Sequence, residues 1–376
     1  MSEPKLKDPV WVARPPALQR TVQELAQTDC IAVDTESNSL FAYREQVCLI
    51  QFSNAEDDYL IDPLAIADLT ALDRLFADPR IEKVFHAAEY DLICLKRDYG
   101  FTFQNLFDTM VASRVLGRAG VGLGSLLKEE FGIELDKRYQ RANWGQRPLP
   151  AAQLAYARLD THFLIPLRDR LKDALVAAGR WELAQEDFIR LEKTAPPDGE
   201  HVNGTCWKIA GNAELNARQM AVLHALCDYR DRQAQITNLP LFKVLSNEVL
   251  VQTAQALPKT MAELQEKTRL SPRQLERHGA GLLKAVEQGL QAEAPRRPIH
   301  HRPDELYLAR LDTLRNWRKN TGRELGVESD VVLPRDTMEI IAQANPKSRT
   351  DLEQLMSDLP WRLERFGAEI LRVLNP

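Results

Sequence analysis

The sequence predicts an α/β domain built on a mixed sheet, followed by two smaller all-α helical bundle domains. In the first half of the chain, short apolar segments of strand length alternate with amphipathic segments of helix length, which is the pattern of a sheet covered by helices. After residue 200 the strand-like segments stop and helix-like segments continue. This helical part contains an internal repeat, because LERHGA at 275–280 recurs as LERFGA at 363–368, 88 residues later.

Length and composition agree with several folded domains. The chain has 376 residues, of which 44% are hydrophobic, enough for two or three cores. Its net charge of −5 is uneven: residues 1–206 carry 32 acidic and 24 basic side chains, and residues 207–376 carry 22 and 25. An acidic first half suits binding of divalent cations and a less acidic second half suits contact with phosphates, although ordinary solvated surfaces also give such balances.

The same inventory argues against a secreted or membrane protein. The N-terminus has no apolar run of signal-peptide length, and no segment approaches the ~18 apolar residues that cross a bilayer. The five cysteines form no CxxC pair and are odd in number, which predicts reduced, mostly buried side chains and no structural zinc site. We therefore expect a cytoplasmic protein.

Alternation of strand and helix patterns gives the elements of the first domain. Gly100 is the expected C-terminal stop of one helix, Pro150 the start of another and Pro166 a kink within it. In order, we expect a helix over 17–28, strands over 31–36, 46–52 and 58–62, a helix over 71–77, a strand over 81–86, helices over 87–97 and 105–117, and a helix from Pro150 whose apolar stripe continues to Leu175. Residues 180–193 complete the domain.

Candidate site residues begin where the first of these strands ends. Asp34 and Glu36 follow an apolar run and are spaced i, i+2, so an extended strand presents both carboxylates on one face. Such acidic pairs are common by chance in a chain with 54 acidic residues, so this one gains weight only from two acidic patterns further along.

The second acidic pattern lies at the strand-to-helix junction near residue 86. His86 closes the strand, and Asp91 falls in the first turn or so of the next helix, from which its carboxylate could point at the sheet edge. Glu89 competes for the same role, and Asp91 could simply favour the helix N-terminus. We expect His86 to be structural or to face substrate, because no His or Cys partner lies at metal-ligand spacing.

The third pattern pairs a phenol with a carboxylate. Tyr156 and Asp160 are spaced i, i+4 and therefore share one helical face. A phenol in this position could bind water that a metal held by the carboxylate activates. The alternative is a plain Tyr–Asp hydrogen bond on an exposed face.

Taken in order, these patterns resemble the three exonuclease motifs of the DEDD superfamily, in the subgroup that carries a tyrosine. The segments between them resemble ribonuclease D, namely CLIQ at 48–51, FDT at 107–109 and WxxRPL at 144–149. The resemblance covers residues 30–175 and implies a ribonuclease H-like fold with 3′–5′ exoribonuclease activity. Ser37 departs from it, because many bacterial relatives carry an aromatic residue there. That variant is similar to exosome-associated relatives, and it leaves substrate preference open.

The resemblance also implies a ligand set of four carboxylates for two divalent cations, Mg²⁺ or Mn²⁺. Asp34 would bridge the two ions, Glu36 and Asp160 would complete the site that activates water, and Asp91 would hold the second ion. Tyr156 would orient the attacking water. The implied substrates are RNAs, such as tRNA precursors, degraded to mononucleotides. The alternatives are a DNA 3′–5′ exonuclease and a catalytically inactive scaffold that binds nucleic acid.

The two copies of the repeat resemble HRDC domains. At the same offset of 88, YR at 229–230, VL at 244–245 and PK at 258–259 recur as WR, VL and PK. We expect about five helices per copy and domains over 1–194, 207–294 and 304–376. Each copy could bind RNA or could pack on the nuclease and shape its entrance. The residues of the connector that could contact phosphates are Arg296, Arg297, His300, His301 and Arg302.

Overall fold

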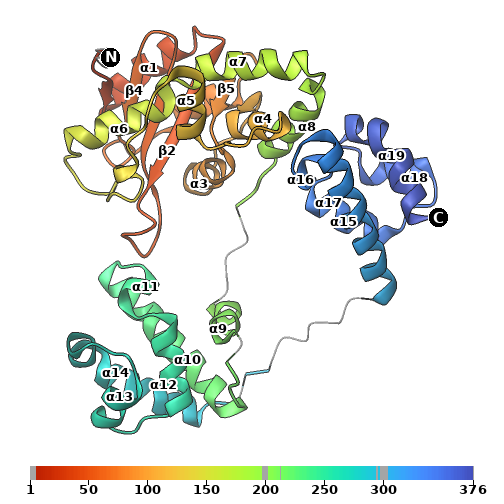
Figure 1. Ribbon diagram of the computed structural model, residues 1–376. Coiled ribbons are helices and arrows are strands. Elements are labelled where there is room, and N and C mark those ends of the chain that lie inside the picture. The colour runs from red at the N-terminus through yellow and green to blue at the C-terminus, as the bar shows by residue number, and fades with distance from the viewer. Residues whose placement is uncertain (1–5, 197–201, 212, 294, 297–303, 376) are drawn as a thin grey trace. The chain divides into compact units, whose positions relative to one another are not determined.

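The computed structural model describes residues 6–196, 202–211, 213–293, 295–296 and 304–375 (Figure 1). The chain divides into two compact units. Unit 1 comprises residues 1–37, 47–196 and 302–376, and unit 2 comprises residues 38–46 and 197–301. Apart from Arg296, the connector residues expected to contact phosphates lie outside the described part of the chain. The domain boundaries given above remain predictions.

Unit 1 contains a sheet of six strands in the order β1-β4-β3-β2-β5-β6. Strand β3 pairs antiparallel with both β2 and β4, while β1 with β4, β2 with β5, and β5 with β6 are parallel pairs. The mixed sheet is therefore confirmed. The strands are β1 (Val10–Val12), β2 (Cys30–Ser37), β3 (Val47–Ser53), β4 (Asp58–Ile61), β5 (Glu82–Phe85) and β6 (Leu106–Asp108).

The sequence pattern predicts neither β1 nor β6, and the helix expected over 105–117 overlaps the residues of β6. Both strands are three residues long and form the two edges of the sheet, where a strand has one partner and needs little periodic sequence. The expected kink at Pro166 was also wrong. The helix ends at His162 and a new helix begins at Leu164, so that Pro166 lies in the first turn of the second helix, where its missing N–H costs no hydrogen bond.

Helices cover both faces of the sheet, and β2 alternates between the two cores. Ile31 and Val33 join the core beneath α1, α2 and α3, whereas Cys30 and Ala32 join the core beneath α4, α5, α7 and α8. The bounds are α1 (Pro15–Leu25), α2 (Thr70–Ala77), α3 (Glu89–Tyr99), α4 (Thr109–Val115), α5 (Leu123–Phe131), α6 (Ala151–His162), α7 (Leu164–Ala177) and α8 (Trp181–Glu192). Gly100 ends α3 in a left-handed conformation, as expected.

The internal repeat is confirmed helix by helix, because each helix of the second copy begins 88 residues after its counterpart. Arg230 donates to the carbonyl of Leu245 at 3.1 Å, and Arg318, at the equivalent position, donates to the carbonyl of Leu333 at 2.8 Å. Helix α9 (Val202–Ala210) precedes the first copy. The paired helices are α10 (Ala217–Thr237) and α15 (Glu305–Leu325), α11 (Leu241–Val244) and α16 (Ser329–Val332), α12 (Asn247–Ala256) and α17 (Arg335–Ala344), α13 (Met261–Lys267) and α18 (Arg349–Leu355), and α14 (Pro272–Gln291) and α19 (Pro360–Leu374).

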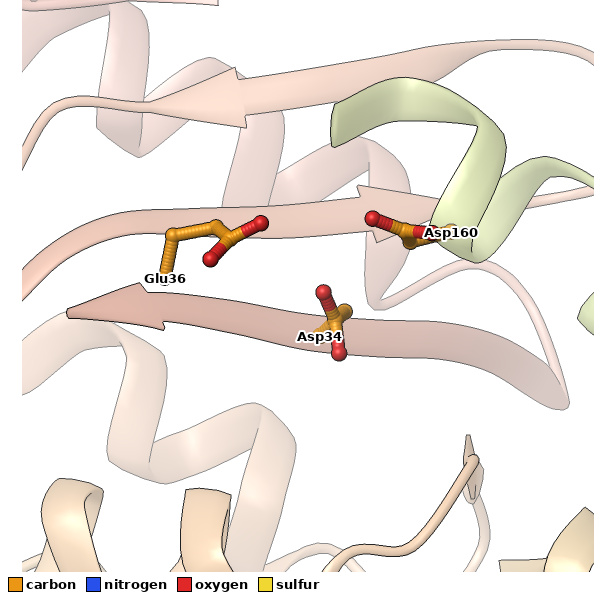
Figure 2. A group of neighbouring side chains, drawn as sticks. All are labelled: Asp34, Glu36 and Asp160. Carbon is orange, nitrogen blue, oxygen red and sulfur yellow. The ribbon is translucent and has the colours of Figure 1, made fainter. Parts of the chain in front are cut away.

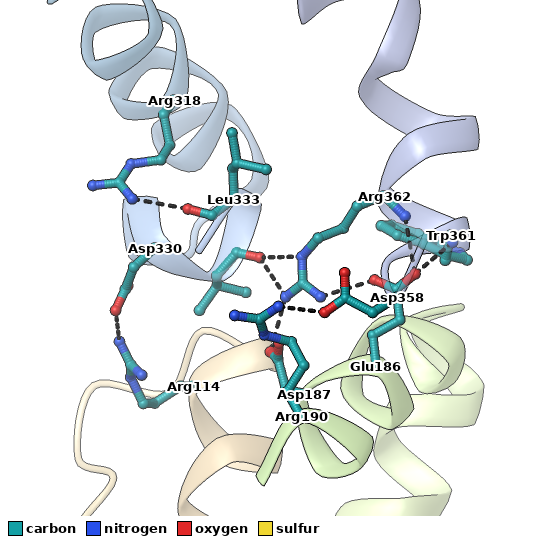
Figure 3. A network of polar contacts seen from close by, with 11 residues as sticks. Arg114, Glu186, Asp187, Arg190, Arg318, Asp330, Leu333, Asp358, Trp361 and Arg362 are labelled. Carbon is teal, nitrogen blue, oxygen red and sulfur yellow. Dashed lines mark hydrogen bonds and ion pairs between the residues drawn. The ribbon is translucent and has the colours of Figure 1, made fainter. Parts of the chain in front are cut away.

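Within unit 1, the second copy packs against α4 and α8 of the α/β domain through a network of ion pairs (Figure 3). Arg190 on α8 lies between Asp336 and Asp358, and Arg114 on α4 pairs with Asp330 at 2.6 Å. Trp361 joins the apolar core that α4, α7 and α8 share, so the junction also buries apolar surface. The second copy therefore serves as a packing partner of the α/β domain.

Two further expectations concern composition. All five cysteines are buried and free. Across the described ranges, no helix combines the length and the apolar character that a bilayer crossing requires.

Candidate active site

Three carboxylates from two distant parts of the sequence converge at one end of β2. Asp34 and Glu36 extend from the strand, and Asp160 reaches them from α6 (Figure 2). One oxygen of each carboxylate lies within 4.8 Å of the others. Helix α6 packs on β2, β3 and β4, and this packing brings Asp160 to the strand end. The structure therefore brings together three of the four predicted acidic ligands as one cluster.

Asp34 is held in place by a residue from the neighbouring strand. Gln51 on β3 lies opposite Asp34 in the antiparallel register, and its Nε2 donates to Asp34 Oδ2 at 3.3 Å. Gln51 is fully buried, and its Oε1 has no hydrogen-bond partner. In the sequence, Gln51 stands out only as part of the CLIQ segment, and the strand register gives this residue a contact with Asp34.

Asp91 borders the same cavity. It lies in the first turn of α3, is 7% exposed, and accepts a hydrogen bond from the hydroxyl of Thr35, which stands between the two acids of β2. Glu89, its competitor in the sequence, is exposed and lines a different cavity. The geometry thus favours Asp91 as the fourth carboxylate, and it identifies Thr35 as a supporting residue that the motif pattern did not reveal.

Tyr156 lies one helical turn before Asp160 on α6 and donates a hydrogen bond to it. The ring packs near those of Tyr139 and Trp144, with centroid distances of 5.9 and 6.1 Å. Burial and the three nearby carboxylates raise the pKa of the Tyr156 phenol far above its usual range. The phenol therefore stays neutral and keeps a proton to donate.

A cavity of about 450 Å³ joins these groups. Its lining includes all five predicted site residues together with His86 and Ala87 of the β5–α3 turn. The lining residues that bear on the chemistry are Asp34, Glu36, His86, Asp91, Tyr156 and Asp160.

The electrostatics of the cluster favour bound cations. Burial, and then repulsion between the carboxylates, raises the pKa of Asp34 and Glu36 well above the usual range. Burial also raises the pKa of Asp91 and Asp160 to about 7 each. Carboxylates that lie this close together and are this strongly desolvated keep their protons unless a bound cation takes the place of the protons. Their hard oxygen atoms fit divalent cations such as Mg²⁺ or Mn²⁺.

Asp108 organises the turn that leads from β5 to α3. Its two carboxylate oxygens accept hydrogen bonds from the backbone N–H of Ala87 at 3.2 Å and of Ala88 at 2.6 Å, and one of them also caps α4. Ala87 has a φ of 62°, a left-handed conformation that is uncommon for alanine. These contacts explain the FDT segment at 107–109, which shapes the turn beside Asp91.

Arg147 performs a similar role for the WxxRPL segment. Its guanidinium makes two hydrogen bonds to Asp62, at 2.8 and 2.6 Å, and one to the carbonyl of Cys48 at 2.7 Å. A bidentate Arg–carboxylate pair fixes both partners in orientation. The segment that carries Trp144 is thereby tied to the sheet next to Tyr156.

Comparison with known proteins agrees with this geometry. Residues 9–176 match the family described as 3′–5′ exonuclease, and residues 219–286 and 308–374 match the HRDC domain family. A ribonuclease D of Acidiphilium cryptum is 29% identical over 98% of this chain and 94% of its own length. The crystal structure of Escherichia coli RNase D superimposes with a TM-score of 0.72 at 26% identity, covering 98% of this chain and 99% of that one.

Another relative, the Arabidopsis thaliana protein RRP6-like 1, is 30% identical over 84% of this chain. The match covers 50% of that protein, so this chain spans about half the length of such relatives. The matches to the exonuclease and HRDC families occur in the order and at the positions where the structure has the mixed sheet and the two helical repeats. The chain belongs to the ribonuclease D family of 3′–5′ exonucleases.

Proposed function

We propose that this protein is a metal-dependent 3′–5′ exoribonuclease that removes mononucleotides from the 3′ ends of structured RNAs such as tRNA precursors. The observation that carries the proposal is the cluster of Asp34, Glu36 and Asp160, with Asp91 and Tyr156 on the same cavity. Its relative from E. coli is described as an exoribonuclease involved in structured RNA processing, which supports the choice of RNA.

The residues have distinct parts in this mechanism. Asp34, Glu36, Asp91 and Asp160 would hold two divalent cations, Mg²⁺ or Mn²⁺. When bound, these cations supply positive charge that offsets the negative charge on the attacking and leaving oxygens of phosphodiester hydrolysis. Gln51 and Thr35 fix the orientation of Asp34 and Asp91 through their hydrogen bonds. The neutral Tyr156 hydroxyl would orient the attacking water by a hydrogen bond.

The test is digestion of RNA and DNA oligonucleotides of the same sequence, labelled at either the 3′ or the 5′ end, with Mg²⁺, with Mn²⁺ and with chelator. We expect mononucleotides released from the 3′ end of RNA only when metal is present. Asp34→Asn should lower the rate at least about 1,000-fold, since a charged ligand at the reacting centre is lost. A matched control is Asp312→Asn, because that side chain is 69% exposed on α15.

Two alternatives are decided by the same assay. Faster release from DNA than from RNA would identify a DNA exonuclease. Binding of RNA without any metal-dependent hydrolysis would identify an inactive scaffold. Activity of Asp34→Asn close to that of the unmodified protein would remove Asp34 from the mechanism.

A further inference from the structure

His86 is the one imidazole among the lining residues of the active-site cavity that the structure describes, and the proposed mechanism gives it no part. It follows β5 directly, and its Nδ1 lies 2.9 Å from the hydroxyl of Thr109. Thr109 is fully buried at the start of α4, and its hydroxyl donates to the carbonyl of Phe85 at 3.1 Å. The contacts from His86 Nδ1 to the Thr109 hydroxyl, and from that hydroxyl to the Phe85 carbonyl, therefore determine which imidazole nitrogen carries the proton.

A threonine hydroxyl has a single proton and two lone pairs. Because the proton of Thr109 is directed at Phe85, the hydroxyl meets the imidazole with a lone pair, and Nδ1 must be the donor. Burial lowers the pKa of His86, so the ring is neutral near pH 7 and has one N–H. The other nitrogen, Nε2, is consequently an unprotonated hydrogen-bond acceptor.

This acceptor is open to the cavity. Nε2 makes no hydrogen bond to any residue within the described ranges, and it is not one of the sealed polar atoms that lack a partner. Its ring lines the same cavity as Asp34 and Asp91. A substrate bound there meets a fixed acceptor beside the carboxylates.

Few groups of a nucleic acid can donate to such an acceptor. Phosphate oxygens only accept, so they are repelled by an unprotonated nitrogen. The amino and imino N–H donors of the bases differ in number and position among the four bases, whereas an enzyme that removes successive nucleotides has to accept each base in turn. Ribose hydroxyls are donors that every ribonucleotide carries, and the 2′-hydroxyl is what distinguishes RNA from DNA.

We propose that Nε2 of His86 accepts a hydrogen bond from a hydroxyl of the 3′-terminal ribose, which makes His86 a specificity-determining residue for the sugar. This inference rests on the proposed exonuclease function and deepens it. Thr109 is a positioning residue in this scheme, because it acts by fixing the tautomer of His86 and the orientation of its ring.

The experiment compares RNA oligonucleotides that end in a ribonucleotide, a 2′-deoxynucleotide or a 3′-deoxynucleotide, digested by the unmodified protein and by His86→Phe. The phenyl ring keeps the shape of the side chain and removes the acceptor. The unmodified protein should lose about tenfold in kcat/KM on one of the deoxy ends, the size expected when a buried acceptor loses its donor. His86→Phe should show the same low value on all three ends.

The two deoxy substrates identify which hydroxyl is bound. Thr109→Val should weaken the preference in the same direction as His86→Phe, and Thr109→Ser should keep it, because serine retains the hydroxyl. The inference would be overturned if His86→Phe kept the sugar preference of the unmodified protein. It would also be overturned if this substitution lowered kcat/KM by the same factor on all three ends, relative to the unmodified protein. Circular dichroism of each variant checks that the fold is retained.

Two further measurements separate this inference from the proposed function. The ¹⁵N chemical shifts of the His86 ring in the unmodified protein report the tautomer directly, and a proton on Nε2 at neutral pH would refute the assignment whatever the activity. If no substrate is hydrolysed, the proposed function fails. The affinity for ribose and deoxyribose ends, measured by fluorescence anisotropy, then still tests the contact: weaker binding of a deoxy end supports it and equal binding rejects it.

Discussion

Nη1 of Arg362 donates to Glu186 Oε2 at 2.8 Å, which joins α19 of the second helical copy to α8 of the nuclease part (Figure 3). Arg362 is fully buried, and its guanidinium also reaches Asp187 and the carbonyl of Val331. The other oxygen of Glu186 accepts from the first backbone N–H groups of α19. The equivalent position of the first copy, 88 residues earlier, is the partly exposed Gln274, so this ion-pair contact is a feature of the second copy.

The first prediction concerns this contact. Replacing Arg362 with Met leaves the buried carboxylate of Glu186 and the partly exposed carboxylate of Asp187 without this cation, which should cost about 3–5 kcal/mol of unfolding free energy. Urea denaturation measures the loss, and limited proteolysis reports release of the second copy. Arg365→Met is the matched control, because Arg365 is half exposed and, among the residues that the structure describes, forms its ion pair with Glu369 of the same helix. It should therefore change stability by less than about 0.5 kcal/mol. Equal urea midpoints for both variants would contradict a structural role for Arg362.

The second prediction separates the two acids of the β5–α3 junction. Asp91→Asn should lower the hydrolysis rate at least about 100-fold, because it removes a charge from the cluster. Glu89→Gln should leave the rate within about twofold, because that side chain faces another cavity. Single-turnover rates at saturating Mg²⁺ provide the measurement. The assignment of the fourth carboxylate is wrong if the Glu89 variant is the inactive one.

The third prediction concerns pH and metal together. Because the pKa values of Asp91 and Asp160 are raised to about 7 by burial, the metal-free fold binds protons that the unfolded chain has already released above pH 4. The stability of the metal-free protein should therefore fall as the pH rises from about 4 to about 7. Mg²⁺ competes with those protons, so the rise in Tm that it produces should grow over the same range.

Thermal denaturation with Mg²⁺ and with chelator, at half-unit steps of pH, tests this relationship. Asp160→Asn should flatten both dependences, since the amide neither titrates nor attracts a cation. A shift in Tm with Mg²⁺ that is the same at pH 5 and pH 8 would show that metal binding is not linked to these carboxyl groups.

The fourth prediction concerns Gln51. Gln51→Leu removes a hydrogen bond to Asp34 and also removes a buried oxygen without a partner, so the stability should change little or increase. Activity should fall about 10- to 100-fold, because Asp34 loses the group that orients it. Urea midpoints and kcat, measured on the same preparations, test both halves. Full activity in Gln51→Leu would show that the strand alone orients Asp34.

Local sequence determined much of this protein. The alternation of β2 places Asp34 and Glu36 on one face, the i, i+4 spacing places Tyr156 beside Asp160, and the offset of 88 residues is reproduced by every pair of repeat helices. The first two features follow from backbone geometry, because side chains on one face repeat every 2.0 residues in a strand and every 3.6 residues in a helix. The third follows from the repeated sequence.

Tertiary structure decided what periodicity does not encode. The packing of α6 on the sheet brings Asp160 within 4.8 Å of carboxylates more than 120 residues earlier, and the turn at Ala87 directs Asp91 rather than Glu89 into the cavity. The short strands β1 and β6 exist because a neighbouring strand offers them hydrogen bonds, and the second copy docks because Arg362 meets two acids on α8. Each of these outcomes depends on a surface supplied by a distant segment, and no local pattern specifies that partner.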